Sequence, residues 1–356
     1  MNCHTHTGVL STKPVGVLSR KNFLRAAGFS AAGLALGGCT QEQPKAPSGE
    51  KNSSSESSKI TFVLDYTPNT NHTGIYVAQE KGLFKAHGLE VEIQQPPADG
   101  ADALIGSGGA QMGVSYQDFI ANNLASEHPL PYTAVAAIIQ HNLSGIMSRK
   151  DDGITRPREM QNHTYATWNL PVEQATVKSV VQTDGGDPES IKMVPYEVDD
   201  EVLGLKANMF DTVWVYEQWA VQNAEVQGFP YNYFSFQSID SVFDIYTPVI
   251  AANDEYLKSN PEAVRGFLAA VREGYEYAVS NPEDAADILL KAVPELDRDL
   301  VHKSQKFLAA KYIDDAESWG AIDKNRWSKF YQWLNDQKLL EKQIDVAAGF
   351  TTEYLK

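Results

Sequence analysis

Short β-rich runs alternate with helical segments from residue 60 onward, and no other feature of the chain constrains its fold as strongly. Residues 60–64 (ITFVL) favour a strand, and residues 72–85 place apolar side chains at helical spacing up to Gly82. Residues 89–93 (LEVEI) alternate in polarity, as a half-buried strand does. Strands and helices of this length in alternation predict an α/β fold with a mainly parallel sheet.

The alternation continues along the chain and then gives way to longer helices. Further strands are expected at residues 111–115, 132–139, 165–167, 191–194 and 211–215, and short helices at 102–105, 118–126, 172–182, 202–207 and 218–224. Residues 243–252 favour an extended apolar segment. Long helices are expected at 261–280, 282–292, 298–310 and 324–334, each with Pro, Asp or Asn near its start.

Composition excludes several classes of function. The 356 residues suffice for two domains of typical size, and their formal net charge of −16 argues against a nucleic-acid partner, because an acidic surface cannot neutralise phosphates. Both cysteines, Cys3 and Cys39, precede the predicted globular part. That part therefore has no disulfide and no thiolate for a metal site or a nucleophile. The 8 histidines show no ligand spacing, so we expect neither a metal nor a cofactor.

The N-terminal residues predict export and lipid anchoring. Residues 1–38 combine basic side chains with a short apolar stretch at 26–38, which is typical of a signal peptide and too short to span a bilayer. Residues 36–39 (LGGC) resemble a bacterial lipobox, which makes Cys39 the lipidated residue. Residues 19–25 (SRKNFLR) resemble a twin-arginine signal in which Lys21 stands in place of the second arginine. Residues 39–58, rich in Ser, Glu, Lys and Pro, predict a disordered tether.

Aromatic and polar side chains gather at the ends of four predicted strands. Because ligands in open α/β sheets bind beyond the carboxyl ends of strands, these positions predict a binding cleft. They are Asp65 and Tyr66 after the first strand, Ser115, Tyr116 and Gln117 after another, Trp168 after a third, and Trp214, Tyr216 and Glu217 at the end of a fourth.

Three blocks of sequence resemble a known family. Residues 65–84 (DYTPNTNHTGIYVAQEKGLF) are similar to the opening signature of the NMT1/THI5-like proteins, which bind precursors of thiamine. Residues 108–117 (GGAQMGVSYQ) and 168–173 (WNLPVE) are similar to the second and third signatures of that family, and residues 211–219 and 243–249 match in kind. The resemblance extends over residues 60 to about 350.

The resemblance implies a type II periplasmic-binding-protein fold with a ligand between two hinged α/β lobes. Lobe 1 would contain residues 59–147 and 248–356, and lobe 2 would contain 148–247, with hinge crossings near 146–148 and 246–248. It also implies a function: an extracytoplasmic, membrane-anchored substrate-binding lipoprotein that delivers a small molecule to the permease of an ABC importer. We expect a monomer that catalyses no reaction.

The implied ligand is an aminopyrimidine, such as hydroxymethylpyrimidine or formylaminopyrimidine. Its ring needs stacking surfaces, and its amine and ring nitrogens need acceptors and donors. The candidate acceptors are Asp65, Glu173, Glu217 and Asp244; the candidate donors are Asn69, His72 and Gln117; the candidate stacking residues are Tyr66, Tyr116, Trp168, Trp214 and Tyr246.

Several of these residues have structural alternatives. Trp214 lies within an apolar strand and suits a core position, Asp65 suits a helix cap or a hinge hydrogen bond, and His72 suits a helix cap. Trp219, Trp327 and Trp333 lie on predicted helices and favour the core.

Two alternative functions follow from the same resemblance. Related receptors bind riboflavin, sulfonates such as taurine, or nitrate. The family also includes a pyrimidine synthase that uses pyridoxal phosphate, consumes one of its own histidines and carries a cysteine-rich metal motif. This chain lacks that motif, because it has no cysteine after Cys39. Its predicted export also separates the protein from cytosolic pyridoxal phosphate.

Overall fold

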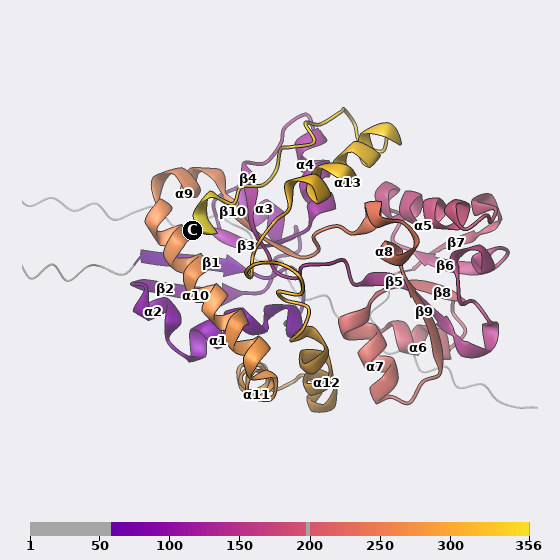
Figure 1. Cartoon of the computed structure of the whole chain (residues 1–356), viewed down its shortest axis with the longest axis horizontal. Helices are drawn as coiled ribbons and strands as arrows, with labels where there is room; N and C mark the ends of the chain where they lie inside the picture. The colour runs from indigo at the N-terminus through magenta and orange to yellow at the C-terminus, as the bar shows by residue number, and fades with distance from the viewer. Residues whose placement is uncertain (1–57, 197–199, 356) are drawn as a thin grey trace, which may run out of the picture. The chain divides into compact units, whose positions relative to one another are not determined.

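The computed structural model describes residues 58–196 and 200–355 (Figure 1). The predicted signal peptide, the lipidation site at Cys39 and the tether as far as residue 57 lie outside the described residues, and Ser58, expected to end the tether, begins the first strand. Within the described part of the chain, the strands form two five-stranded sheets. No helix in that part is both long enough and apolar enough to cross a membrane.

The first sheet has the strand order β2-β1-β3-β10-β4. Strand β1 pairs in parallel with β2 and β3, whereas β10 runs antiparallel to both of its neighbours. In Figure 1, β10 comes from late in the chain and lies between strands from its N-terminal part. The strand bounds are β1 Ser58–Val63, β2 Leu89–Gln94, β3 Met112–Ser115, β4 Tyr132–Ala137 and β10 Val249–Asn253.

The second sheet repeats this topology in the order β7-β6-β8-β5-β9. Strand β6 pairs in parallel with β7 and β8, and β5 runs antiparallel to β8 and β9. In each sheet the antiparallel strand stands fourth in order and is the first strand after the chain arrives from the other sheet. The bounds are β5 Ser144–Arg149, β6 Thr164–Thr167, β7 Lys192–Pro195, β8 Thr212–Tyr216 and β9 Tyr231–Ser235.

Helices follow the strands of both sheets, and the long helices lie near the C-terminus of the sequence. The helix bounds are α1 Thr73–Glu80, α2 Leu83–Ala86, α3 Ala101–Gly106, α4 Gln117–Ala125, α5 Pro171–Thr183, α6 Glu201–Lys206, α7 Gln222–Val226, α8 Phe236–Ile239, α9 Asp254–Ser259, α10 Pro261–Ser280, α11 Pro282–Ala292, α12 Arg298–Leu308 and α13 Lys324–Asp336. A π-helix, η5 (Glu217–Val221), connects β8 to α7.

Helix α10 shows why the long helices form and how closely they pack. Proline stands at its first position, and buried side chains recur every three or four residues from Val264 to Ala278. It crosses α1 at two glycines. A β-carbon on Gly274 would lie 2.1 Å from the carbonyl oxygen of Gly74, so the two backbones are in direct contact. All five residues of β10 are buried, as expected for a strand covered on both faces.

The chain changes sheets through two short segments. The first comprises residues 138–143, between β4 and β5, and the second comprises residues 244–248, before β10. The second segment includes residues 246–248. The first lies earlier than the expected 146–148, because residues 144–149 already pair with β8 and β9.

Candidate functional site

Asp65, directly after β1, is the centre of a buried polar cluster. Its side chain is 5% exposed. Nε2 of His72 lies 2.7 Å from its Oδ1, and the hydroxyl of Tyr116 donates to its Oδ2. Burial alone would raise the pKa of Asp65, but His72 and the hydrogen bond from Tyr116 hold it below its usual value. The structure thus brings three predicted site residues together around an ionised carboxylate.

The turn before α1 fixes the orientation of His72. The backbone N–H of Asn69 donates to Nδ1 of His72 (3.1 Å), and the side chain of Asn69 accepts a bond from the N–H of Asn71 (2.9 Å). Because Nδ1 is an acceptor, the ring proton resides on Nε2 and is donated to Asp65. His72 therefore closes the turn with one nitrogen and positions Asp65 with the other.

The second sheet contributes Tyr216 to the same region. Tyr216 ends β8, and the side chain of Gln218, two residues later, donates to Asn71 in the turn before α1 (3.2 Å). Burial and the charges of Asp118 and Asp65 raise the pKa of Tyr216, which places this phenol within electrostatic reach of both carboxylates. Burial also raises the pKa of Asp118, in the first turn of α4, to about 6. Strand ends from both sheets therefore converge here.

A group of three aromatic side chains lies in the second sheet. The rings of Trp168 and Trp214 are 5.7 Å apart, and those of Trp214 and Phe236 are 4.2 Å apart. The indole Nε1 of Trp214 is buried and, among the described residues, has no hydrogen-bond partner. Trp168 remains 39% exposed, so one face of this group is open to a flat ligand.

Two more aromatic side chains near the strand ends are solvent-exposed. Tyr66, after β1, is 58% exposed, and Phe119, in α4, is 42% exposed and packs edge-on against Tyr116 at 5.1 Å. Large exposed aromatics beside a buried carboxylate are typical of a small-molecule site.

The carboxylate of Glu173 is occupied by hydrogen bonds from neighbouring residues. It stands third in α5 and accepts hydrogen bonds from the hydroxyls of Tyr165 (2.5 Å) and Thr167 (2.9 Å) and from the N–H groups of Trp168 and Leu170. Burial raises its pKa, although these bonds oppose the shift. Its clearest role is therefore to cap α5 and to hold the loop that carries Trp168.

Three other predicted site residues are buried at or beside the first sheet: Ser115 ends β3, Gln117 begins α4, and Tyr246 lies in the second crossing segment. Ser115 is buried beside Asp102, whose pKa is raised by burial. Gln117 is also buried. Its backbone N–H donates to the carbonyl of Tyr246, its side-chain oxygen accepts from the N–H of Tyr246, and its side-chain amide donates to the carbonyl of Trp327. The hydroxyl of Tyr246 accepts a bond from the N–H of Asp323 (2.7 Å). Gln117 and Tyr246 thus connect α4 and the second crossing segment to α13 and its N-cap, and Ser115 is enclosed in the interior.

The two remaining candidates, Glu217 and Asp244, lie after β8 and before β10. Glu217 begins the π-helix after β8, and burial raises its pKa. Asp244 lies in the second crossing segment and pairs with His141 (2.8 Å) and Arg326 (3.1 Å). Among the predicted site residues, the structure therefore clusters Asp65, His72 and Tyr116 in the first sheet and Trp168 and Trp214 in the second.

Sequence reasoning did not propose Asp118, Phe119 or Phe236. Asp118 and Phe119 directly follow the block 108–117. Their position in the first helical turn after a strand end could have indicated that they lie near the binding site. Phe236 reaches Trp214 only through the pairing of β9 with β5, which no local pattern reveals.

Two surface hollows lie elsewhere, and no predicted site residue lines them. One, of about 650 Å³, lies at α7 and α12 and is lined by Val226, Arg298, Asp299, His302, Lys303 and Lys306. The other, of about 230 Å³, includes Gln111 and Tyr256.

Solved structures establish the class of fold to which these two sheets belong. The alkanesulfonate-binding protein SsuA from Xanthomonas axonopodis pv. citri superposes with a TM-score of 0.63 at 10% identity, covering 83% of this chain and 99% of that one. The expected periplasmic-binding-protein fold is confirmed.

The family follows from the sequence comparisons. The chain belongs to the NMT1/THI5-like family, whose model matches residues 69–285. It is similar to the formylaminopyrimidine-binding protein of Halalkalibacterium halodurans, with 26% identity over 302 residues that cover 82% of this chain and 89% of that protein. It is also similar to a 4-amino-5-hydroxymethyl-2-methylpyrimidine phosphate synthase of Saccharomyces cerevisiae, with 27% identity over 312 residues, 83% of this chain and 88% of that one.

Proposed function

We propose that this protein is the extracytoplasmic substrate-binding component of an ABC importer and that it binds an aminopyrimidine precursor of thiamine. The observation that carries the proposal is the ionised Asp65, held by His72 and Tyr116 at a strand end, with its charge acting on Tyr216 of the second sheet. An aminopyrimidine offers amine hydrogens to such a carboxylate and a flat ring to the neighbouring aromatics. The similarity to a formylaminopyrimidine-binding protein supports this ligand class.

The charges of the site favour an amine-bearing ligand over an anion. The carboxylates Asp65 and Asp118 act electrostatically on both Tyr116 and Tyr216, and the phenol of Tyr216 also acts on Tyr116. A sulfonate or nitrate would meet these negative charges at close range, which is unfavourable in a partly buried site. Sulfonate and nitrate are therefore weaker candidate ligands than an aminopyrimidine. Riboflavin carries no such negative group, but its ring system is larger than a pyrimidine.

Titration calorimetry on the purified protein tests the ligand. We expect hydroxymethylpyrimidine or formylaminopyrimidine to bind, and taurine and nitrate to give no heat of binding. Riboflavin and thiamine are tested as larger ligands: thiamine contains the aminopyrimidine ring, and riboflavin has a larger flat ring system. Tight binding of taurine or riboflavin, with no response to either pyrimidine, would reject the proposed ligand and leave the fold unaffected.

The second candidate function is pyrimidine synthesis, because the yeast relative is named as a synthase. A synthase of the kind that the resemblance implies would consume a histidine of its own chain in the presence of pyridoxal phosphate. Intact-mass measurement before and after incubation with pyridoxal phosphate separates the two functions. We expect an unchanged chain mass and no pyrimidine product; loss of mass at a histidine would favour the synthase.

The anchoring part of the proposal rests on residues 36–39, which lie outside the described part of the chain. We expect a Cys39→Ala variant to leave the membrane fraction or to remain unprocessed. Its pyrimidine affinity should equal that of the wild type, because Cys39 precedes β1 by 19 residues. Unchanged membrane fractionation, with a mature terminus elsewhere, would contradict lipidation at Cys39.

A further inference from the structure

The two segments that join the sheets are tied to each other by Asp244. Its Oδ1 accepts the backbone N–H of Asn142 (3.1 Å), and the side chain of Asn142 donates to the carbonyl of Phe243 (2.7 Å). The first bond connects residues 138–143 directly to residues 244–248, and the second reaches Phe243 immediately before them. Any rotation of one sheet relative to the other must bend both segments, so Asp244 acts where that rotation is controlled.

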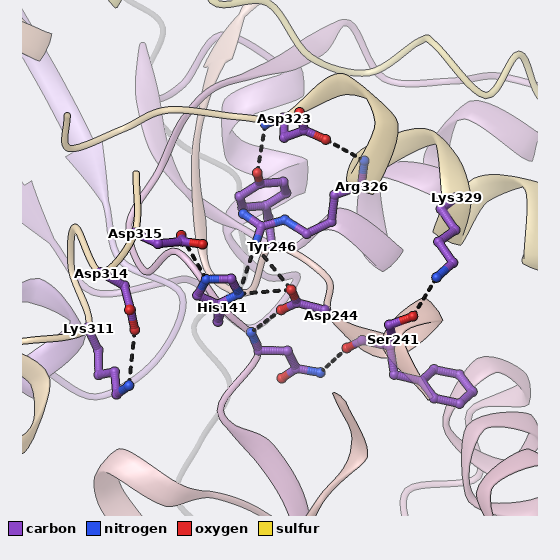
Figure 2. A network of polar contacts seen from close by, with 12 residues as sticks. His141, Ser241, Asp244, Tyr246, Lys311, Asp314, Asp315, Asp323, Arg326 and Lys329 are labelled. Atoms are coloured by element: carbon purple, nitrogen blue, oxygen red, sulfur yellow. Dashed lines mark hydrogen bonds and ion pairs between the residues drawn. The ribbon is translucent and has the colours of Figure 1, made fainter. Parts of the chain in front are cut away.

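His141 adds a titratable group to this connection (Figure 2). Its Nδ1 lies 2.8 Å from Oδ2 of Asp244 and also 2.8 Å from Nη1 of Arg326, and its Nε2 lies 3.0 Å from Oδ1 of Asp315. Arg326 also reaches Oδ2 of Asp244 (3.1 Å) and stacks over the ring of Tyr246 at 4.1 Å. A residue of the first crossing, one of the second and one of α13 therefore meet at a single imidazole.

The imidazole has two hydrogen-bonding states with these same neighbours. Protonated His141 donates from Nδ1 to Asp244 and from Nε2 to Asp315. Neutral His141 keeps the bond to Asp315, and its Nδ1 then accepts from Arg326, so the bond from His141 to Asp244 is lost and only the bonds made by Asn142 still join the crossing segments. The two states differ in whether His141 holds Asp244.

We propose that His141, Asp244 and Arg326 form a proton-dependent clamp on the two crossing segments, and that protonated His141 slows opening of the sheets and release of the ligand. The effect on release rests on the proposed function, because it assumes that the sheets close on a ligand. In the structure, elements packed on the two sheets already touch: Lys303 of α12 pairs with Glu225 of α7 (2.7 Å), and the side chain of Gln218, after β8, donates to Asn71 before α1 (3.2 Å).

The charged surroundings give the direction of the pH dependence. The hydrogen bond to Asp244 raises the pKa of His141, Asp315 adds to this, and burial and Arg326 oppose it. Burial would raise the pKa of Asp244, but His141 and Arg326 hold it below its usual value, so Asp244 stays ionised. The neighbouring Lys311 and Asp314 pair with each other (3.0 Å). The clamp is therefore complete at acidic pH and is lost as the pH rises through the raised pKa of His141.

Stopped-flow tryptophan fluorescence on the full chain, loaded with hydroxymethylpyrimidine, tests the clamp. Between pH 6.5 and 9 we expect release to become about three- to tenfold faster, the range set by a charge-assisted bond that is partly solvent-exposed. A His141→Gln variant should release at the fast rate throughout. Asp315→Asn, at an exposed position, should move the transition to lower pH.

His302 provides the matched control. It also contacts two carboxylates, Glu283 (2.7 Å) and Asp287 (3.1 Å), but all three residues lie in α11 and α12. His302→Gln should keep the wild-type pH dependence. Wild-type pH dependence in His141→Gln, or its loss in His302→Gln, would overturn the clamp.

Hydrogen exchange on the ligand-free chain separates the clamp from the proposed ligand. After correction for intrinsic rates, protection of residues 138–143 and 244–248 should fall with rising pH in the wild type and stay constant in His141→Gln. That result with no pyrimidine binding would retain the clamp and reject the ligand. Constant protection in the wild type would reject the clamp even if the pyrimidine binds.

Discussion

Two carboxylates that look equivalent in the sequence have different surroundings in the structure. Asp65 follows a predicted strand and Glu173 lies at the start of the predicted helix 172–182, but both fall in family-like blocks and both were proposed as ligand acceptors. The oxygens of Asp65 face two side chains, His72 and Tyr116, whereas those of Glu173 face two hydroxyls and two backbone N–H groups of one loop. Pro171 at the first position of α5 and Glu173 at the third were a capping signal in the sequence.

Removing the charge of Asp65 should weaken ligand binding. In Asp65→Asn, the ligand amine loses a charge-assisted bond, typically worth about 1.5–3 kcal/mol, or roughly a tenfold to hundredfold loss of affinity. Calorimetry with hydroxymethylpyrimidine measures it, with the exposed Asp99→Asn as the control that keeps wild-type affinity. Unchanged affinity in Asp65→Asn would place the ligand elsewhere.

Glu173→Ala should instead reduce stability. It leaves four donors without their acceptor, and the hydroxyls of Tyr165 and Thr167 among them are buried, so we expect the free energy of unfolding to fall by about 2–3 kcal/mol. Urea denaturation measures this, and the exposed Glu189→Ala is the control. A hundredfold loss of affinity at unchanged stability would show that Glu173 contacts the ligand.

At the scale of elements, the local pattern predicted most helices and strands. Helices α10 and α11 have their expected bounds, because proline starts both and their apolar stripes are regular. Strand β9 and the pairing of β5 were not expected, since antiparallel pairing depends on contacts distant in sequence. For the same reason the cluster around Trp214 could not be assembled from the sequence, although Asp65, His72 and Tyr116 were all proposed.

The contact between α1 and α10 should not tolerate a methyl group. In Gly274→Ala the new β-carbon would overlap the carbonyl of Gly74, so the helices must separate, at a cost of about 1–3 kcal/mol. Because α1 begins directly after His72, pyrimidine affinity should fall as well. Thermal and urea unfolding, with calorimetry, measure both effects.

Gly266 in the same helix is the matched control for this prediction. A β-carbon there would lie 3.4 Å from its nearest neighbour, the side chain of His87. Gly266→Ala should therefore be neutral or stabilise the protein by up to about 1 kcal/mol through helix propensity. Equal destabilisation by both substitutions would mean that helix packing at Gly274 is not the cause.

At the scale of the molecule, the family-like blocks carried more information than the alternation of strands and helices. Alternation predicts an α/β fold, but it does not show that a later strand returns to the first sheet. The return of β10 between β3 and β4 is what creates two crossing segments, and it was expected only from the resemblance. Asp244, proposed as a ligand acceptor, lies at one of these crossings and serves the connection between them.

Two sheets joined by two short segments should close on a ligand that contacts both. Asp65 and Tyr116 come from the first sheet, and Trp168 and Tyr216 come from the second, so a ligand between them stabilises the closed arrangement over the open one. Small-angle scattering should therefore show a smaller radius of gyration at saturating hydroxymethylpyrimidine than without it. Asp65→Asn at the same ligand concentration should keep the larger radius. Identical wild-type curves with and without saturating ligand would contradict closure, and they would confine any role of the crossing segments to stability.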